Sequence, residues 1–299
     1  MTSYGKQNIS KEDISAVVEV LKSDYLTQGP VVEKFEKVIS EITKSSYATA
    51  VNSATSALHL GCIALGVKKN DLVWTSANSF VASSNCALYC GAEVDFIDID
   101  PETDNISIGF LEEKLKLAKK NNKLPKLIIP VHLSGSSCEM FKLHSLSKKY
   151  GFKILEDASH CIGGSYKGKP IGSCDYSDAC VFSFHPVKII TTGEGGVITT
   201  NSKEIDDQIK ALRSHGIVRE KSKFTNKMTP PFYYEMQFLG FNYRMTEIQA
   251  ALGISQSKKL PQIIKKRWEL AYIYDQEIKN GIIEKPNLDL RKGSSFHLY

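Results

Sequence analysis

Lys188 is the residue whose type and position most clearly indicate chemistry. It follows the apolar run from Ala179 to Phe184, which has the composition of a strand, and it precedes a Thr/Gly-rich turn at residues 191–196. A lysine at a strand end, in a dry pocket, can be kept neutral and nucleophilic because burial disfavours its charged form. Such an amine can form a Schiff base with an aldehyde cofactor. The alternative is an ordinary solvated surface lysine.

Asp157 is a second chemical candidate, because it comes directly after the apolar residues 152–155. Acidic residues at the carboxyl end of a parallel strand lie where open α/β sheets bind ligands. A buried aspartate there can keep a pyridinium nitrogen protonated, which makes pyridoxal 5′-phosphate (PLP) an electron sink. Taken alone, Asp157 is better interpreted as a helix N-cap or a surface turn acid.

A third feature is a run of small polar residues between a strand at 48–51 and an apolar helix at 54–65. Free backbone N–H groups and hydroxyls at a helix N-terminus form a natural phosphate site, here at Ala54, Thr55 and Ser56. An ordinary Ser/Thr helix cap is the alternative. A phosphate site, an acid and a lysine, each at a strand end, together favour a PLP-binding protein.

Alternating strands and helices would position these features. Apolar runs bounded by turn residues predict strands at 48–51, 72–75, 94–97, 126–131, 152–155, 179–184 and 197–200. Helical spacing predicts helices after Ser10, after Pro30, and at 54–65, 110–120, 137–150, 246–259 and 262–279. Repeated strand–helix units of this length predict an α/β fold with a mostly parallel sheet flanked by helices. The polar, basic residues 216–231 predict a loop.

Composition argues against several other classes of protein. The chain has 299 residues, of which 42% are hydrophobic and 24% charged, with a net charge of +5; these values are ordinary for a globular protein. It lacks a basic stripe with interleaved aromatics, so we expect no nucleic-acid partner. We also expect no signal peptide and no membrane span. Seven cysteines without CxxC spacing predict reduced thiols and a cytoplasmic location, and the absence of Cys/His ligand spacing predicts no metal.

Two sequence patterns that would indicate nucleotide binding are not supported. The segment Gly163 to Lys169 has the spacing GxxxxGK, but Pro170 stands where a phosphate loop needs Ser or Thr, so a hairpin turn is the better interpretation. No GxGxxG follows a predicted strand, which removes support for a nicotinamide-dependent enzyme.

Longer motifs resemble a known family. They are NSATSALH (52–59), EDASH (156–160), SFHPVKIITTGEGG (183–196), RSHG (213–216), GFNYRMTEIQAALG (240–253) and SSFHLY (294–299). Their order resembles the DegT/DnrJ/EryC1/StrS family, PLP-dependent sugar aminotransferases of the aspartate aminotransferase fold (fold type I). The resemblance runs from Tyr4 to Tyr299. Within the family it is greatest to enzymes of pseudaminic acid biosynthesis.

The resemblance implies roles for individual residues around the cofactor. Lys188 is implied to form the Schiff base with PLP and to be the catalytic acid and base. Asp157 is implied to pair with the pyridine nitrogen, with His160 near the ring oxygen and Phe80 stacking on the ring. The phosphate is implied to be held by Ala54, Thr55, Ser56 and Ser183, and by Asn242 of a second subunit, which makes the enzyme a homodimer.

The resemblance also implies the substrates. L-glutamate is the expected amine donor, and the acceptor is C4 of a UDP-linked 4-keto-6-deoxy-N-acetylhexosamine. The residues implied for the sugar nucleotide are Tyr4, Asp24, Tyr25, Leu26, Thr27, His185, His297, Leu298 and Tyr299. Other readings are an aminotransferase for another nucleotide-linked keto sugar, or a truncated, non-catalytic relative. A related PLP-dependent sugar dehydratase is disfavoured, because it would carry histidine in place of Lys188.

Two domains are expected. Residues 1–255 would form a large PLP-binding domain that includes the N-terminal helices. Residues 256–299 would begin a smaller C-terminal domain, which is expected to be incomplete because the given sequence ends with the SSFHLY segment, which starts the first strand of that domain in the family.

Overall fold

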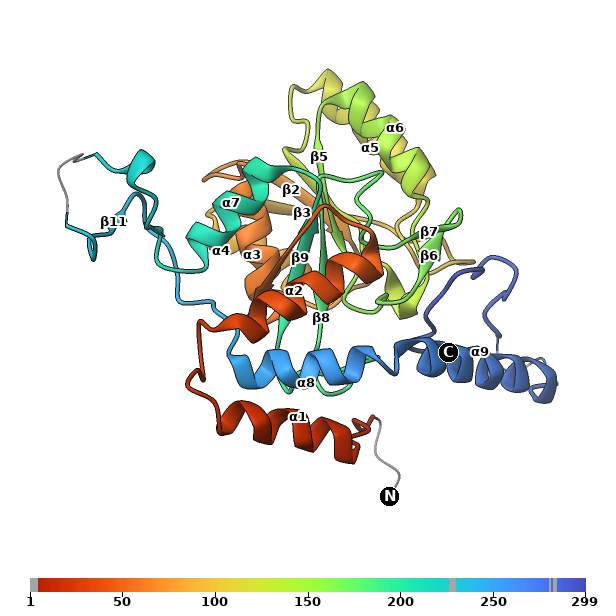
Figure 1. Ribbon diagram of the computed structural model, residues 1–299. Helices are drawn as coiled ribbons and strands as arrows, with labels where there is room; N and C mark the ends of the chain where they lie inside the picture. The colour runs from red at the N-terminus through yellow and green to blue at the C-terminus, as the bar shows by residue number, and fades with distance from the viewer. Residues whose placement is uncertain (1–4, 226–229, 280, 282–283) are drawn as a thin grey trace.

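The computed structural model describes residues 5–225, 230–279, 281 and 284–299, and its centre is a seven-stranded sheet (Figure 1). The strands are β1 (Tyr47–Val51), β2 (Leu72–Ser76), β3 (Glu93–Ile97), β4 (Leu127–Ile129), β5 (Lys153–Asp157), β8 (Ala179–Ser183) and β9 (Gly196–Thr200), in the order β1-β9-β8-β5-β4-β2-β3. β9 is antiparallel to both of its neighbours, β1 and β8. The remaining neighbours pair in parallel. The sheet is therefore mostly parallel, as the sequence predicts.

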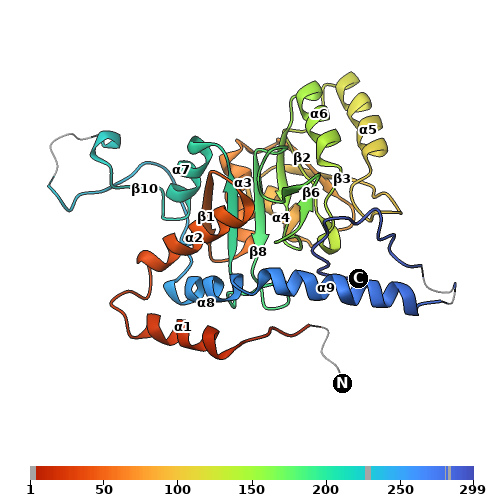
Figure 2. The same ribbon diagram turned by 45° about the vertical axis from the view of Figure 1, so that its right-hand side comes forward.

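Helices cover both faces of the sheet. They are α1 (Lys11–Leu21), α2 (Pro30–Thr43), α3 (Ala54–Ala64), α4 (Ala82–Tyr89), α5 (Ile108–Lys120), α6 (Met140–Tyr150), α7 (Lys203–Leu212), α8 (Glu247–Ser257) and α9 (Leu260–Glu277). Side chains alternate between the two faces of a strand. Leu155 and Val181 accordingly pack against α3 and α4, with α7 in the same cluster. Phe182 faces α2 and α8, and Ile154 faces α5 and α6 (Figure 2).

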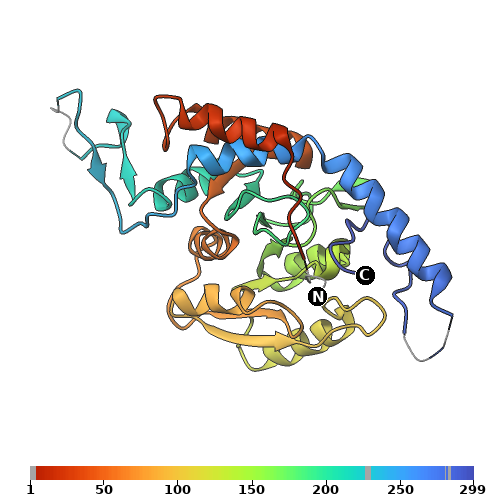
Figure 3. The ribbon, with the colours of Figure 1, turned by 90° about the horizontal axis from the view of Figure 1, so that it is seen from below.

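α1 lies outside the α2–α8 layer, alongside α8 (Figure 3). A buried ion pair attaches it there: Nζ of Lys259 is 2.6 Å from Oδ2 of Asp13, and Nε2 of Gln256 donates to the same oxygen at 2.7 Å. The predicted helix after Ser10 begins with a capping box, since Ser10 and Asp13 each bond the backbone N–H of the other.

All seven predicted strands are confirmed, each within two residues at either end. The predicted hairpin turn near Gly168 is also confirmed, because β6 (Ser165–Tyr166) pairs antiparallel with β7 (Lys169–Pro170). The predicted helices are present as well, but α6 begins at Met140 rather than at Ser137. Before it, η1 (Leu133–Gly135) is a single 3-10 turn, and the Ser137 hydroxyl bonds the Cys138 carbonyl instead of capping a helix.

The prediction of a loop at residues 216–231 is wrong in part. β10 (Ile217–Val218) pairs antiparallel with β11 (Glu235–Met236), and η2 (Lys221–Lys223) forms one 3-10 turn between them. The pairing of two-residue strands depends on a return of the chain after Pro231, and this return leaves no local periodicity in the sequence. Figure 1 shows this segment projecting from the sheet beyond α7.

Candidate active site

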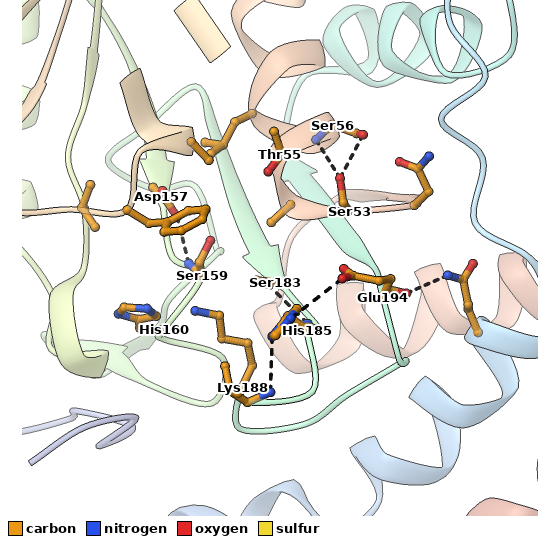
Figure 4. A pocket seen from close by; sticks show the side chains of 18 residues that line it. Ser53, Thr55, Ser56, Asp157, Ser159, His160, Ser183, His185, Lys188 and Glu194 are labelled. Carbon is orange, nitrogen blue, oxygen red and sulfur yellow. Dashed lines mark hydrogen bonds and ion pairs between the residues drawn. The ribbon is translucent and has the colours of Figure 1, made fainter. Parts of the chain in front are cut away.

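The loop that carries Lys188 connects two adjacent strands, β8 and β9. Backbone bonds fix both of its ends: Phe184 N donates to Gly195 O at 2.9 Å, and Thr192 N donates to Phe184 O at 3.0 Å. Lys188 N donates to His185 O at 2.9 Å, which closes a turn after Pro186. As a result, the lysine side chain points into a pocket toward His160 and the end of β5 (Figure 4).

Asp157 is the last residue of β5 and is 4% exposed. Its Oδ2 accepts a hydrogen bond from Oγ of Ser83 at 2.7 Å, and its Oδ1 accepts one from Ser159 N at 3.1 Å. Two donors, one on each oxygen, fix the orientation of this buried carboxylate.

The electrostatics around Lys188 favour a reactive amine. Burial lowers the pKa of Lys188, and the negative charge of Asp157 opposes this shift in part. Burial, together with the charge of Lys188, also lowers the pKa of His160 to about 4, so this imidazole is neutral near neutral pH. The pocket thus combines a lysine that loses its proton readily, a fixed carboxylate and an uncharged imidazole.

The start of α3 forms the opposite wall of the pocket. Ser53 is its N-cap, with an extended backbone, and Oγ of Ser53 accepts from Ser56 N at 3.1 Å. Early helical N–H groups have no partner within their own helix, so they are available to an anion. Gly196 passes so close that a Cβ on it would lie 2.6 Å from Ala54 N. Only glycine allows β9 to approach the helix start this closely.

These elements enclose a cavity of about 790 Å³, within the usual size range of small-molecule sites. Eight of the nine cofactor-binding residues expected from the sequence line it: Ala54, Thr55, Ser56, Phe80, Asp157, His160, Ser183 and Lys188. Phe80 is 69% exposed although its side chain is large and apolar, which suits an aromatic ring that stacks on a flat ligand. His185, expected at the substrate, also lines the cavity.

The residues present fit PLP. Two buried polar atoms near the cavity lack a hydrogen-bond partner among the described residues: Nδ1 of His160 and Oδ1 of Asn52. A carboxylate for a pyridine nitrogen, an amine for an aldehyde and a helix N-terminus for a phosphate surround one space. Among the described residues no group of three or more His, Cys, Asp or Glu is arranged to hold a metal ion.

The C-terminal residues approach the same cavity from α9. The ring centroids of His297 and His160 are 4.4 Å apart, and burial, with His160 and two cationic side chains, lowers the pKa of His297 to about 2. Leu298 N donates to Ser134 O at 3.2 Å, and the ring of Tyr299 contacts that of Tyr274. His297 thus lies behind His160, but none of the three lines the cavity.

Other expected residues lie elsewhere in this single chain. Asn242 forms a bridge with Ser214 and does not line the cavity. Residues 24–27 are exposed between α1 and α2, where Leu26 O accepts from Glu247 N. Tyr4 lies outside the described residues.

The sequence reasoning missed several residues that line the cavity, among them Asn52, Ser53, Ser159, Glu194 and Gln249. All five lie within the motifs quoted above, and the first four are close in sequence to named site residues, which was an available signal. Gln249 comes from α8, and its Nε2 donates to Glu194 O at 2.9 Å. No local pattern indicates that contact.

Within the described part of the chain, no helix is both long and apolar enough to cross a lipid bilayer.

Comparisons with known proteins agree with this geometry. A Campylobacter jejuni UDP-4-amino-4,6-dideoxy-N-acetyl-beta-L-altrosamine transaminase is 42% identical over 300 residues, covering 100% of this chain and 76% of that protein. Helicobacter pylori PseC, an aminotransferase involved in the biosynthesis of pseudaminic acid, superimposes with a TM-score of 0.88 at 36% identity, over 99% of this chain and 76% of PseC.

A third relative carries a bound cofactor. The crystal structure of Bacillus subtilis NtdA with bound PMP has a TM-score of 0.80 at 30% identity, over 97% of this chain and 63% of that one. The aspartate aminotransferase-like fold expected from the sequence is confirmed. The family model for DegT/DnrJ/EryC1/StrS aminotransferases matches residues 7–299, and the chain belongs to that family.

Proposed function

We propose that this chain transfers an amino group from L-glutamate to C4 of a UDP-linked 4-keto-6-deoxy-N-acetylhexosamine. The product is UDP-4-amino-4,6-dideoxy-N-acetyl-β-L-altrosamine, as in the name of the C. jejuni relative. The observation that carries the proposal is the convergence of Lys188, Asp157 and the start of α3 on one cavity. Membership of the aminotransferase family gives the reaction class.

PLP, the cofactor of this aminotransferase, stabilises negative charge that develops on a carbon next to an attached amine. Lys188 is the group of this chain that would attach the cofactor and then hold and return a proton at its Nζ, because burial lowers its pKa and the amine loses its proton more readily than a solvated lysine. Asp157 is the partner for the ring nitrogen, and Phe80 provides the flat surface on which the ring lies.

The phosphate would be held by the N–H groups and hydroxyls at 54–56, together with the hydroxyl of Ser183. His160 would donate or accept at the ring oxygen, since its Nδ1 has no partner among the described residues.

A homodimer would complete the site. Asn242 does not line the cavity of its own chain, so we place it at the cofactor phosphate of the partner subunit's site. Large apolar side chains that precede it in the chain, Phe232 and Leu239, are 81% and 79% exposed and would be covered by that partner. Sedimentation of the Asn242→Ala variant would show an intact dimer with weaker PLP binding; an unchanged affinity would refute this role.

The sugar nucleotide would bind at the open side of the cavity. His185, which lines the cavity, would contact it, and so would His297, Leu298 and Tyr299, while Tyr4 and residues 24–27 would contribute at the subunit boundary. We also propose that the enzyme works in the cytoplasm, in line with its seven free cysteines. Other enzymes there would make its sugar-nucleotide substrate and consume its product.

The test follows amino transfer directly. Purified protein with PLP and glutamate is offered the UDP-linked 4-keto sugar, and the amino sugar and 2-oxoglutarate are measured by mass spectrometry. Lys188→Ala should lower single-turnover conversion at least about 100-fold, whereas Lys167→Ala, a lysine outside the cavity, should not. Conversion of a dTDP- or GDP-linked keto sugar in preference to the UDP-linked one would refute the proposed substrate. Retained turnover in Lys188→Ala would refute the proposed role of Lys188.

A further inference from the structure

Ser83 is a buried serine with no role assigned so far except its contact with Asp157. It lies in the first turn of α4, is 0% exposed, and its Oγ is 2.7 Å from Oδ2 of Asp157. We propose that Ser83 is a positioning residue for the transamination: it holds the Asp157 carboxylate in the orientation that aims it at the ring nitrogen of the cofactor. This inference rests on the proposed function, because it assigns Asp157 to that nitrogen.

The Asp157 carboxylate is fixed from two directions. Its backbone is bonded toward β4, where Asp157 N donates to Pro130 O at 2.9 Å and His132 N donates to Asp157 O at 3.0 Å. Its side chain is held by Ser83 at one oxygen and by the N–H of Ser159 at the other. Each carboxylate oxygen therefore has one bonded donor and one free lone pair, and rotation about the side-chain bonds would break both hydrogen bonds.

A neutral donor suits this position better than a charged one. An ionised carboxylate only accepts hydrogen bonds, so the Ser83 hydroxyl must donate its proton to it. A neutral hydroxyl fixes the orientation of the carboxylate and leaves its negative charge intact. Lys or Arg at position 83 would cancel the charge that keeps the ring nitrogen protonated, and Ala would leave one oxygen without a partner.

The same turn of chain also places Phe80. Ser83 N donates to Phe80 O at 3.1 Å, and the Cys86 thiol donates to Ser83 O at 3.4 Å. Phe80 lines the cavity, whereas Ser83 lies beneath it against Asp157. One turn therefore supplies the proposed stacking ring and the donor that fixes the acid, so movement of the start of α4 would disturb both.

Affinity for two cofactor forms tests this role. The dissociation constants of PLP and of its analogue with the ring nitrogen replaced by carbon are measured for wild type, Ser83→Ala, Ser83→Thr and Ser84→Ala. Ser84 is the matched control, because it follows Ser83 on α4 and its hydroxyl bonds only the backbone carbonyl of Val81 among the described residues. Ser83→Ala should weaken PLP roughly tenfold, the size expected from loss of a hydrogen bond to a charged group.

The analogue should bind Ser83→Ala and wild type equally, since it has no ring nitrogen for Asp157. In an Asp157→Asn background, Ser83→Ala should have little further effect on PLP binding. Ser83→Thr, which keeps the hydroxyl, should recover part of the affinity, and Ser84→Ala should resemble wild type. The pH at which the visible spectrum of the bound cofactor changes should also shift in Ser83→Ala and not in Ser84→Ala.

Several results would overturn the inference. Equal PLP affinity of Ser83→Ala and wild type would do so, and so would equal weakening of PLP and the analogue, or additive losses with Asp157→Asn. Thermal unfolding of the cofactor-free variants checks that each is folded, and Ser83→Cys, close in volume but a weak donor, replaces Ser83→Ala if that variant is not folded. A wild-type chain that binds no PLP would overturn the proposed function itself.

Discussion

Gly196 and Ala54 come closer together than a side chain at position 196 would permit. A Cβ on Gly196 would lie 2.6 Å from Ala54 N and 2.6 Å from the carbonyl carbon of Ser53. These are backbone atoms at the start of α3, so they cannot give way as a flexible side chain would. The first residue of β9 is therefore one condition for the position of the phosphate site.

This contact yields a prediction for Gly196→Ala. The added methyl group should displace the start of α3 and lower the affinity for PLP at least tenfold, with loss of thermal stability from the strained contact. Fluorescence titration with PLP and a melting curve measure the two effects. Gly109→Ala is the control, because a Cβ there meets one atom at 3.8 Å. A Gly196→Ala protein with unchanged affinity would show that the α3 terminus does not hold the phosphate.

A second prediction concerns the amine of Lys188 in the cofactor-free protein. Because burial lowers its pKa, Lys188 should react with an amine-modifying reagent at lower pH than Lys11, which is exposed. The charge of Asp157 opposes this shift, so Asp157→Asn should extend the reactivity of Lys188 to still lower pH. Peptide mapping by mass spectrometry across a pH series measures both residues in one sample. Equal pH dependence of the two lysines would contradict the dry environment of Lys188.

A third prediction concerns acid stability. The pKa of His160 is lowered from 6.5 to about 4, so the unfolded chain binds its proton more readily than the folded one. Stability should then fall as the pH decreases from about 6.5 to about 4, by up to about 3 kcal/mol from this group. Burial of His297 acts in the same direction.

Urea unfolding of the cofactor-free protein across this pH range measures the loss. In His160→Gln the slope with pH should be smaller, because one of the two imidazoles whose pKa is lowered by burial, His160 and His297, is gone. His144→Gln is the control, since His144 lies on α6 away from the cavity. If His160→Gln and His144→Gln follow the same curve, His160 does not titrate as proposed.

A fourth prediction concerns the attachment of α1. Burial by itself would raise the pKa of Asp13, but the bonds from Lys259 and Ser10 N outweigh it and lower the pKa to about 2. The stability from Asp13 is therefore present above about pH 3.8 and is lost as the pH falls through about 2. Asp13→Ala should reduce the free energy of unfolding at neutral pH by about 2 kcal/mol.

Denaturant unfolding compares Asp13→Ala with Glu19→Ala. Glu19 forms an ion pair on the same helix, but its side chain is 71% exposed. Its loss should change stability by no more than about 0.5 kcal/mol, because exposed pairs are screened by water. Equal effects of the two substitutions would show that the buried pair does not anchor α1.

The main sheet and the centre of the site were predictable from the sequence. β5 and β8 each end at a residue whose chemistry is unlike that of the preceding apolar run, and Asp157 and Ser183 mark those ends. Polar residues at the carboxyl ends of neighbouring parallel strands must converge, so Lys188 and Asp157 could be placed together before the structure was known.

Other contacts depend on tertiary packing. Gln249 reaches the cavity because α8 crosses beneath β8 and β9, and Ser83 meets Asp157 because α4 packs on the same face of the sheet. Helical spacing predicts that such helices form, but not which strand each one covers. The role expected of Asn242 depends on a second chain, so neither its spacing nor the fold of one chain can test it.

The reversed direction of β9 also has a consequence for the folding of this chain during translation. β1 is at the edge of the sheet and pairs with β9, so Val51 finds its partner Gly196 only after most of the sheet-forming residues have been made. Contacts between distant parts of a chain form slowly. A ribosome-bound chain that ends before β9 has neither a fixed start of α3 nor the Lys188 loop in place. Uptake of PLP by the nascent protein would therefore report that the last strand of the sheet has been inserted.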